Sequence, residues 1–166
     1  MRDFHHAGRS TVHGVNGAIA TSQPLATIAG LDILRAGGNA IDAALAASAV
    51  LCVVEPMMTG IGGDCFALIA KGGALPVIGL NASGRSPAGL TADKLRAAGH
   101  QAMPTHSADS VTIPGALLGW DMMLKEHGTM SLGDVLQPAI RAACDGYVVG
   151  PRVGMDWLFL AGLLEK

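Results

Sequence analysis

Apolar residues recur at the spacing of an amphipathic helix near the start of the chain. The repeat consists of Leu25, Ile28, Leu31 and Leu34. Pro24 precedes it and suits the first position of a helix, whereas Gly37 and Gly38 follow it and can adopt the left-handed conformation of a helix C-terminus. The pattern predicts one helix between these signals, and the small apolar residues at 15–21 predict a short buried strand before it.

A second helix is predicted directly afterwards. Asn39 is placed to cap it, and Asp42 lies three residues further on, where a carboxylate faces the unpaired amides of the first turn. The residues after Asp42 are nearly all Ala, Leu and Val, and Glu55-Pro56 ends the run. A helix that is apolar on every face lies inside the protein, and its alanines let neighbouring backbones approach closely.

Two apolar runs in the middle of the chain predict a β-hairpin. They occupy residues 65–70 and 75–80 and flank the turn signal Lys71-Gly72-Gly73-Ala74, so we expect two strands that are buried on both faces. A hairpin at this place argues against a purely parallel sheet. The pattern therefore predicts an α+β fold, with residues 1–166 forming one domain.

The second half of the chain alternates between helix and turn signals. Thr91 is placed to cap a short helix, residues 110–113 predict a further strand, and residues 117–128 carry an apolar helical repeat. Ser131 is placed to cap another helix. Because Pro138 would lose a hydrogen bond inside a helix, we expect two helical pieces there, the second of which ends at Gly146.

Composition limits the classes of partner. The chain is 50% hydrophobic and 14% charged, against about 25% charged in average soluble proteins, so much apolar surface is expected to need a partner. The apolar residues 157–164 indicate a segment cut within an element, and the alternative is a terminal helix docked on its own core. A net charge of −2 and six aromatic residues argue against nucleic-acid binding.

The cysteines and the start of the chain bear on its location. Cys52, Cys65 and Cys144 lie in apolar segments without metal-binding spacing, which favours reduced, buried thiols. The first six residues lack the apolar stretch of a secretory signal, and the longest uncharged apolar run is too short to span a bilayer. We therefore expect a cytoplasmic protein without a membrane span, unless a leader was removed.

The order of these features resembles one enzyme family. The Ala-rich helix pair is followed by Glu55-Pro56, by Gly60-Ile61-Gly62-Gly63-Asp64-Cys65-Phe66 and by Asn81-Ala82-Ser83-Gly84-Arg85, and the resemblance continues from Val111 to Val149. Over nearly its whole length the chain resembles the start of a gamma-glutamyltranspeptidase, a member of the N-terminal-nucleophile hydrolases.

The resemblance implies a fold and two subunits with different roles. The fold is four-layered, with two stacked antiparallel sheets between helical layers, and this chain would supply its N-terminal part. In the family the chain cleaves itself, and the catalytic threonine becomes the first residue of a downstream small subunit. No residue here matches that threonine, so the resemblance implies a partner subunit that carries the nucleophile, and no catalytic residue in this chain.

Arg85 is the candidate substrate-binding residue. It follows a predicted strand, with Gly84 before it and Ser86-Pro87 after it, and its guanidinium offers paired donors that match a carboxylate. The alternative on residue chemistry alone is a surface or inter-strand ion pair. The resemblance implies that Arg85 holds the α-carboxylate of a gamma-glutamyl group.

The glycine-rich loop at residues 60–64 invites comparison with a dinucleotide-binding loop. That motif follows a strand and opens a helix, whereas this loop follows a predicted helix and opens a strand, so we expect a tight turn that needs positive φ or close backbone approach. Asp64 and Ser86 depart from typical members of the family. They indicate a divergent branch that acts on small amides bearing a carboxylate, although Asp64 alone is typical of a turn.

No cofactor is expected. The six histidines, which are His5, His6, His13, His100, His106 and His127, lack metal-ligand spacing, and no serine lies in a nucleophile-elbow motif. Two hypotheses remain open: part of a self-processing amide hydrolase or acyltransferase, and a non-catalytic scaffold or binding fragment without the nucleophile.

Overall fold

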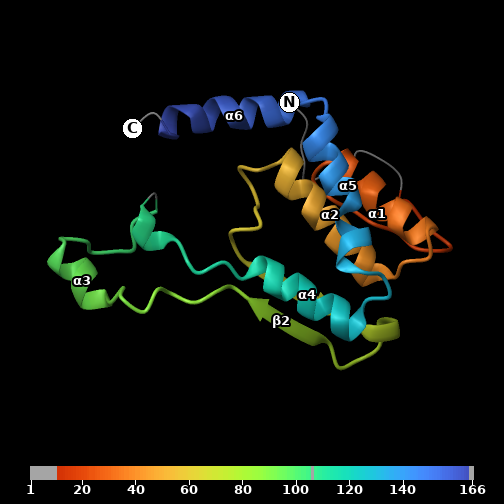
Figure 1. The fold of residues 1–166 in the computed structure, drawn as a ribbon, viewed down its shortest axis with the longest axis horizontal. Helices are drawn as coiled ribbons and strands as arrows, with labels where there is room; N and C mark the ends of the chain where they lie inside the picture. Colours follow the sequence, from red (N-terminus) through yellow and green to blue (C-terminus); the bar gives the residue numbers. More distant parts are fainter. Residues whose placement is uncertain (1–10, 106, 165–166) are drawn as a thin grey trace.

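The computed structural model describes residues 11–105 and 107–164 as a layer of helices next to a small antiparallel sheet (Figure 1). The elements in chain order are α1 (Pro24–Arg35), α2 (Ala40–Val54), β1 (Cys65–Ile69), the 3₁₀ turn η1 (Lys71–Gly73), β2 (Ile78–Ala82), α3 (Ala92–Ala97), the 3₁₀ turn η2 (Ala108–Ser110), α4 (Ala116–His127), α5 (Leu132–Asp145) and α6 (Pro151–Leu164).

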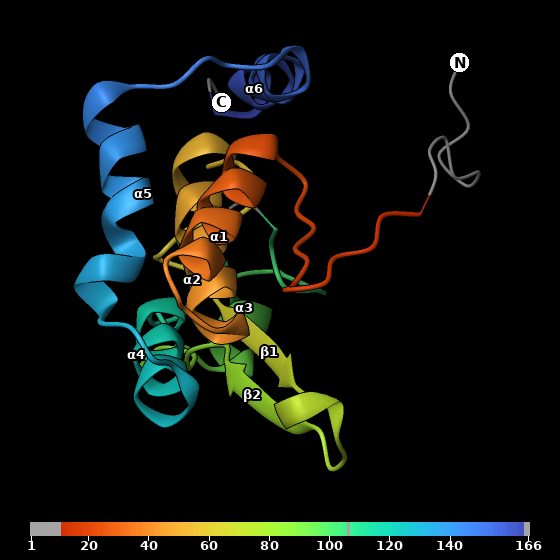
Figure 2. The same cartoon turned by 90° about the vertical axis from the view of Figure 1, so that its right-hand side faces the viewer.

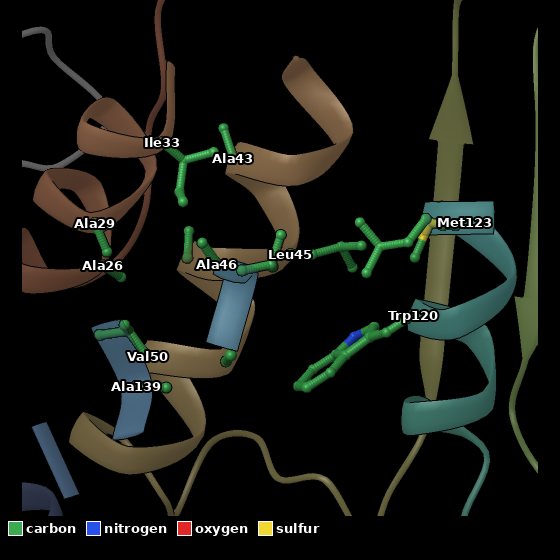
Figure 3. Packing of buried hydrophobic residues seen from close by; sticks show 14 of the residues in the cluster. Ala26, Ala29, Ile33, Ala43, Leu45, Ala46, Val50, Trp120, Met123 and Ala139 are labelled. Carbon is green, nitrogen blue, oxygen red and sulfur yellow. The ribbon is translucent and has the colours of Figure 1, made fainter. Parts of the chain in front are cut away.

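Helix α2 is the centre of the core. It packs against α1, α5 and α4, and alanines on α1 and α2 let these two backbones lie close together (Figure 3). Val54 of α2 and Val135 of α5 are completely buried, and Trp120 of α4 points toward α2 with only 4% of its surface exposed. The predicted interior position of this helix is therefore confirmed.

The start of α2 is fixed by a buried carboxylate. Asn39 and Asp42 form a reciprocal capping box, and Asp42 also accepts hydrogen bonds from Thr129 N, Thr129 Oγ1 and Met130 N in the loop between α4 and α5. Burial raises the pKa of Asp42, but the hydrogen bonds from Thr129, Asn39 and Met130 lower it more, so the net pKa is below its usual value. The predicted cap thus also joins three helices.

The hairpin is confirmed, but its predicted burial is wrong. Cys65 pairs with Ala82 and Ile69 with Ile78 in an antiparallel register, and α4 covers one face (Figure 2). On the other face Phe66 and Leu68 are 65% and 84% exposed, because no described element covers them. The second strand begins later than predicted, since Pro76 cannot donate to the ladder.

Two predicted strands are not present as strands in the described residues. The chain bends near Gly14 and Gly17, and Val15 is fully exposed. Residues 15–21 therefore pair with no other strand in the described part of the chain. At 110–113 the chain leaves η2 in an extended form, and of its backbone hydrogen bonds only that from Ile113 N to Arg85 O reaches another segment of the described chain. Pro114 then removes the next donor.

Helix α5 is continuous through Pro138, so the predicted split is wrong. Val135 and Ala139, one turn apart, are buried against α2, and this packing outweighs the single hydrogen bond that the proline removes. The other helix boundaries agree closely with the predicted signals: α1 begins at Pro24, α3 is capped by Thr91, and α5 is capped by Ser131 and ends before Gly146.

Helix α6 projects away from the helical cluster (Figure 1). Val153 is buried, but Leu158 and Phe159 are 78% and 75% exposed. The alternative of a terminal helix docked on its own core is therefore wrong for this part of α6. Among the described residues, each helix is too short or too polar to cross a membrane.

Candidate functional site

The chain beyond β2 carries the candidate arginine. The strand ends at Ala82, and Ser83 N donates a 3.0 Å hydrogen bond to Asn81 Oδ1, which turns the backbone. Gly84 comes next in the left-handed region with φ 71°, and Arg85 is the exposed residue after it. The predicted position of Arg85, just past a strand end, is confirmed.

Gly84 allows a close approach that fixes this backbone. Arg85 O accepts a 2.9 Å hydrogen bond from Ile113 N. A Cβ atom on Gly84 would lie 1.9 Å from Ile113 O, so a larger residue would push the two segments apart. Both the positive φ and the contact therefore require glycine at this position.

The glycine-rich loop and the start of α4 meet at the same place. Gly63 O accepts hydrogen bonds of 3.1 Å from Gly115 N and 3.0 Å from Ala116 N, two of the amides that a helix N-terminus leaves unpaired. A Cβ atom on Gly115 would lie 2.3 Å from Ala82 O. The loop, the strand end and the residues before α4 thus form one junction.

A hollow of about 390 Å³ opens beside this junction. It is lined by Met58, Thr59, Gly60, Gly62, Gly63, Asp64, Ser110, Val111 and Thr112. Asp64 is exposed, and Thr112 Oγ1 donates a 3.3 Å hydrogen bond to Asp64 Oδ1. Sequence reasoning missed Thr112 and Gly115, for which the only signal was the dipeptide Pro114-Gly115.

The glycine-rich loop comes after α2 and leads into β1, so the order that argued against a dinucleotide motif is confirmed. Of the two alternatives expected for this turn, positive φ is not found, because Gly60, Gly62 and Gly63 are not among the glycines with positive φ. Open space surrounds Gly60 and Gly62, and the close approach expected of the loop is made by the carbonyl oxygen of Gly63.

Arg85 forms none of the ion pairs found among the described residues. It is also not among the residues that line the hollow, although its backbone is bonded to Ile113, directly after Thr112. The local structure therefore presents an exposed arginine whose backbone is hydrogen-bonded to Ile113. Such a group can bind a carboxylate through paired hydrogen bonds.

The described residues contain no group of three metal-ligating side chains, and His5, His6 and His106 lie outside them. Burial raises the pKa of the Cys52 and Cys65 thiols, but Cys144 is exposed, so its predicted burial is wrong. Cys144 lies near the C-terminal end of α5 and faces solvent, although the residues around it in the sequence are apolar.

Comparisons with known proteins agree on one family. Residues 26–158 match the model of gamma-glutamyltranspeptidase. The chain is 44% identical over 140 residues to the glutathione hydrolase-like YwrD proenzyme of Bacillus subtilis (strain 168), a match that covers 84% of this chain and 26% of that protein.

Two solved structures have the same fold. The cephalosporin acylase of Bacillus halodurans superposes with a TM-score of 0.84 and 43% identity, over 99% of this chain and 31% of that one. The gamma-glutamyltranspeptidase of Helicobacter pylori superposes with a TM-score of 0.81 and 32% identity, over 91% and 44% of the two chains. The predicted α+β class and its relation to N-terminal-nucleophile hydrolases are thereby confirmed.

The matched region is short relative to whole family members. The chain spans about a quarter of the length of the curated relatives it matches, 26% of one and 24% of another. The described residues contribute one two-stranded sheet with its covering helices to the family's layered fold. On the family model, the identities and the shared fold, the chain belongs to the gamma-glutamyltranspeptidase family of N-terminal-nucleophile hydrolases.

Proposed function

We propose that this chain is part of a self-processing amide hydrolase or acyltransferase, and that Arg85 holds a carboxylate of the acyl group. The observation that carries the proposal is the exposed arginine at the end of β2, whose backbone is fixed through Ile113 N and through the glycine at position 84. A guanidinium at this position can orient a carboxylate through paired, charge-assisted hydrogen bonds.

The covalent chemistry belongs to a threonine at the start of a downstream subunit. Its hydroxyl oxygen attacks the amide carbonyl, and its free α-amine takes the hydroxyl proton. The amine of the substrate leaves with a proton, and an ester joins the acyl group to the threonine. Water or an acceptor amine then resolves this ester. The role of Arg85 is to place the carbonyl within reach of the threonine.

The acyl group is a small one that carries a carboxylate. The relatives named glutathione hydrolases favour a gamma-glutamyl group. A second candidate, another carboxylate-bearing acyl group, is favoured by the 43% identity to a cephalosporin acylase and by 42% identity over 154 residues to an acylase of Pseudomonas sp. (strain SE83). Both candidates need the guanidinium of Arg85.

The exposed apolar surfaces support a partner subunit. Phe66 and Leu68 line an open face of the hairpin, and Leu158 and Phe159 line an open face of α6. Monomeric proteins rarely leave such patches uncovered, and the downstream subunit is the occupant that the family membership suggests. We propose a cytoplasmic location, in keeping with the free thiols of Cys52, Cys65 and Cys144.

The processing step is tested by expressing the complete reading frame that contains this chain and taking the intact mass and N-terminal sequences of the product. We expect two chains, the smaller of which begins with threonine. A single unprocessed chain without hydrolase activity would instead support the non-catalytic scaffold or binding fragment.

A further inference from the structure

The chain bends at Val15 and Asn16, before α1, and Gly17 follows the bend. Asn16 and Gly17 are both exposed. Among the described residues, the hydrogen bonds of asparagine side chains all belong to Asn39 and Asn81, and Gly17 N has no backbone acceptor. No hydrogen bond in this part of the structure therefore holds the side chain of Asn16 away from the amide nitrogen of Gly17.

An asparagine side chain and the next backbone nitrogen can react with each other. The nitrogen of Gly17 forms a bond to Cγ of Asn16 and the bond from Cγ to the side-chain nitrogen breaks, so that ammonia leaves with the proton of the Gly17 amide. Water then opens the succinimide ring at either of its carbonyl carbons, which gives aspartate or isoaspartate at position 16. Ring closure is least hindered before glycine, because glycine has no Cβ atom next to the attacking nitrogen.

Asn39 and Asn81 are protected from the same reaction. Asn39 Nδ2 donates a 2.7 Å hydrogen bond to His127 O, and Asn39 Oδ1 accepts from Ile41 N at 2.8 Å. Asn81 lies within β2, and its Oδ1 accepts from Ser83 N at 3.0 Å. Alanine follows each of them and adds a Cβ atom next to the nitrogen that would attack. Since the chain has three asparagines, these two are controls within the same molecule.

The segment around the bend is fitted closely to α1. A Cβ atom on Gly17 would lie 3.2 Å from Leu34 Cδ1. A Cβ atom on Gly30 of α1 would lie 2.2 Å from Ile19 Cδ1. Both products of the reaction add a negative charge beside this contact, and isoaspartate also lengthens the backbone between residues 16 and 17. A modification here therefore changes how the segment fits on the helix.

We propose that Asn16-Gly17 is a site of spontaneous deamidation in the folded protein, through a succinimide that closes between the Asn16 side chain and the Gly17 nitrogen. Three observations carry the proposal: the exposed bend, the lack of hydrogen bonds to the reacting groups in the described structure, and the protection of the other asparagines. The reaction needs neither Arg85 nor a downstream threonine, so it is independent of the proposed function.

The test incubates the product of the complete reading frame in water labelled with heavy oxygen, at neutral and at mildly alkaline pH. Peptide mass spectrometry after digestion in ordinary water measures the label at each asparagine, because ring opening leaves an oxygen atom of the water in the product. We expect uptake at Asn16 to be at least about tenfold faster than at Asn39 or Asn81, where hydrogen bonds have to break first, and to be faster at the higher pH. A rate at Asn16 below this margin would overturn the proposal.

The same measurement in urea separates the effect of the folded structure from that of the sequence motif. Unfolding is expected to change the rate at Asn16 by less than about threefold, since the described structure has no hydrogen bond to break there, and to raise the rates at Asn39 and Asn81. A larger acceleration at Asn16 would show that the folded protein protects it, which refutes the site.

Asn16→Gln is the matched control. Its longer side chain has to close a larger ring, so the peptide that contains position 16 is expected to take up no label. Uptake that persists in this peptide would assign the reaction to another residue and would also refute the site.

Discussion

The buried carboxylate of Asp42 is predicted to be a large single contributor to the stability of the helical layer. It is completely buried and accepts from Asn39 N at 2.8 Å, Thr129 Oγ1 at 2.6 Å, Thr129 N at 3.0 Å and Met130 N at 3.2 Å. Asp42→Asn keeps the volume of the side chain and changes only its charge and one acceptor.

The expected cost is obtained by counting these donors. If the amide oxygen of the variant faces Thr129 N and Met130 N, its NH₂ group faces Asn39 N, which is left without an acceptor. In the flipped amide the oxygen still accepts from Asn39 N and Thr129 N, and Met130 N is left without an acceptor instead. One unsatisfied buried donor costs about 1–3 kcal/mol, and the remaining bonds lose their charge assistance. The predicted loss of unfolding free energy is therefore about 2–4 kcal/mol.

Urea unfolding of the two proteins at pH 7, monitored by far-ultraviolet circular dichroism, measures this loss. Asp93→Asn is the matched control, because Asp93 is 94% exposed and its pair with Arg96 lies in solvent, so its midpoint is expected to stay at the wild-type value. A shift for Asp42→Asn no larger than that of the control would refute the reasoning.

The same geometry predicts three further outcomes. Because the pKa of Asp42 is lowered on folding, the charged carboxylate stabilises the fold above its unfolded pKa of about 4, and this stabilisation is lost as the pH falls through the lower folded value. Urea midpoints measured from pH 7 to pH 3 should therefore show that the difference in stability between wild type and Asp42→Asn becomes smaller. Gly119→Ala would place a Cβ atom 2.7 Å from Ala82 Cβ and should lower the free energy of unfolding by about 1–2 kcal/mol. Gly154→Ala in α6 meets no atom within 4 Å and should raise the free energy of unfolding by about 0.5–1 kcal/mol. Thermal unfolding of both variants measures these two changes. Gly84→Ala should reduce kcat/KM of the complete enzyme at least tenfold through displacement of Arg85, and unchanged kinetics would show that the contact with Ile113 is dispensable.

Local signals explain why most helices could be predicted. Pro24, Asn39, Thr91 and Ser131 act on the amides next to them, so the sequence around each is sufficient to place a helix start. Pro138 is the exception. Its effect on α5 depends on packing against α2, a contact between distant parts of the chain that a local rule does not include.

The strands were harder to predict because a strand needs a partner. The hairpin was found, since its two halves are neighbours in sequence, whereas residues 15–21 and 110–113 have strand-like composition but no ladder in the described structure. The position of Arg85 could be predicted from the strand end before it. The contact of Gly84 with Ile113 and the hollow at Asp64 could not, because they join segments 29 and 48 residues apart.

The most direct test of the carboxylate-binding role is the kinetics of Arg85→Lys in the processed product of the complete reading frame. Two substrates are compared, a gamma-glutamyl anilide and the same anilide with its α-carboxylate converted to an amide. Arg96→Lys, an exposed arginine of α3, is the control.

For the carboxylate substrate we predict that kcat/KM falls about ten- to hundredfold, because lysine cannot supply the paired, charge-assisted hydrogen bonds of a guanidinium. The amide substrate should be turned over equally by wild type and variant. A loss below about threefold with processing intact, or an equal loss on both substrates, would contradict the assignment of Arg85 to the carboxylate.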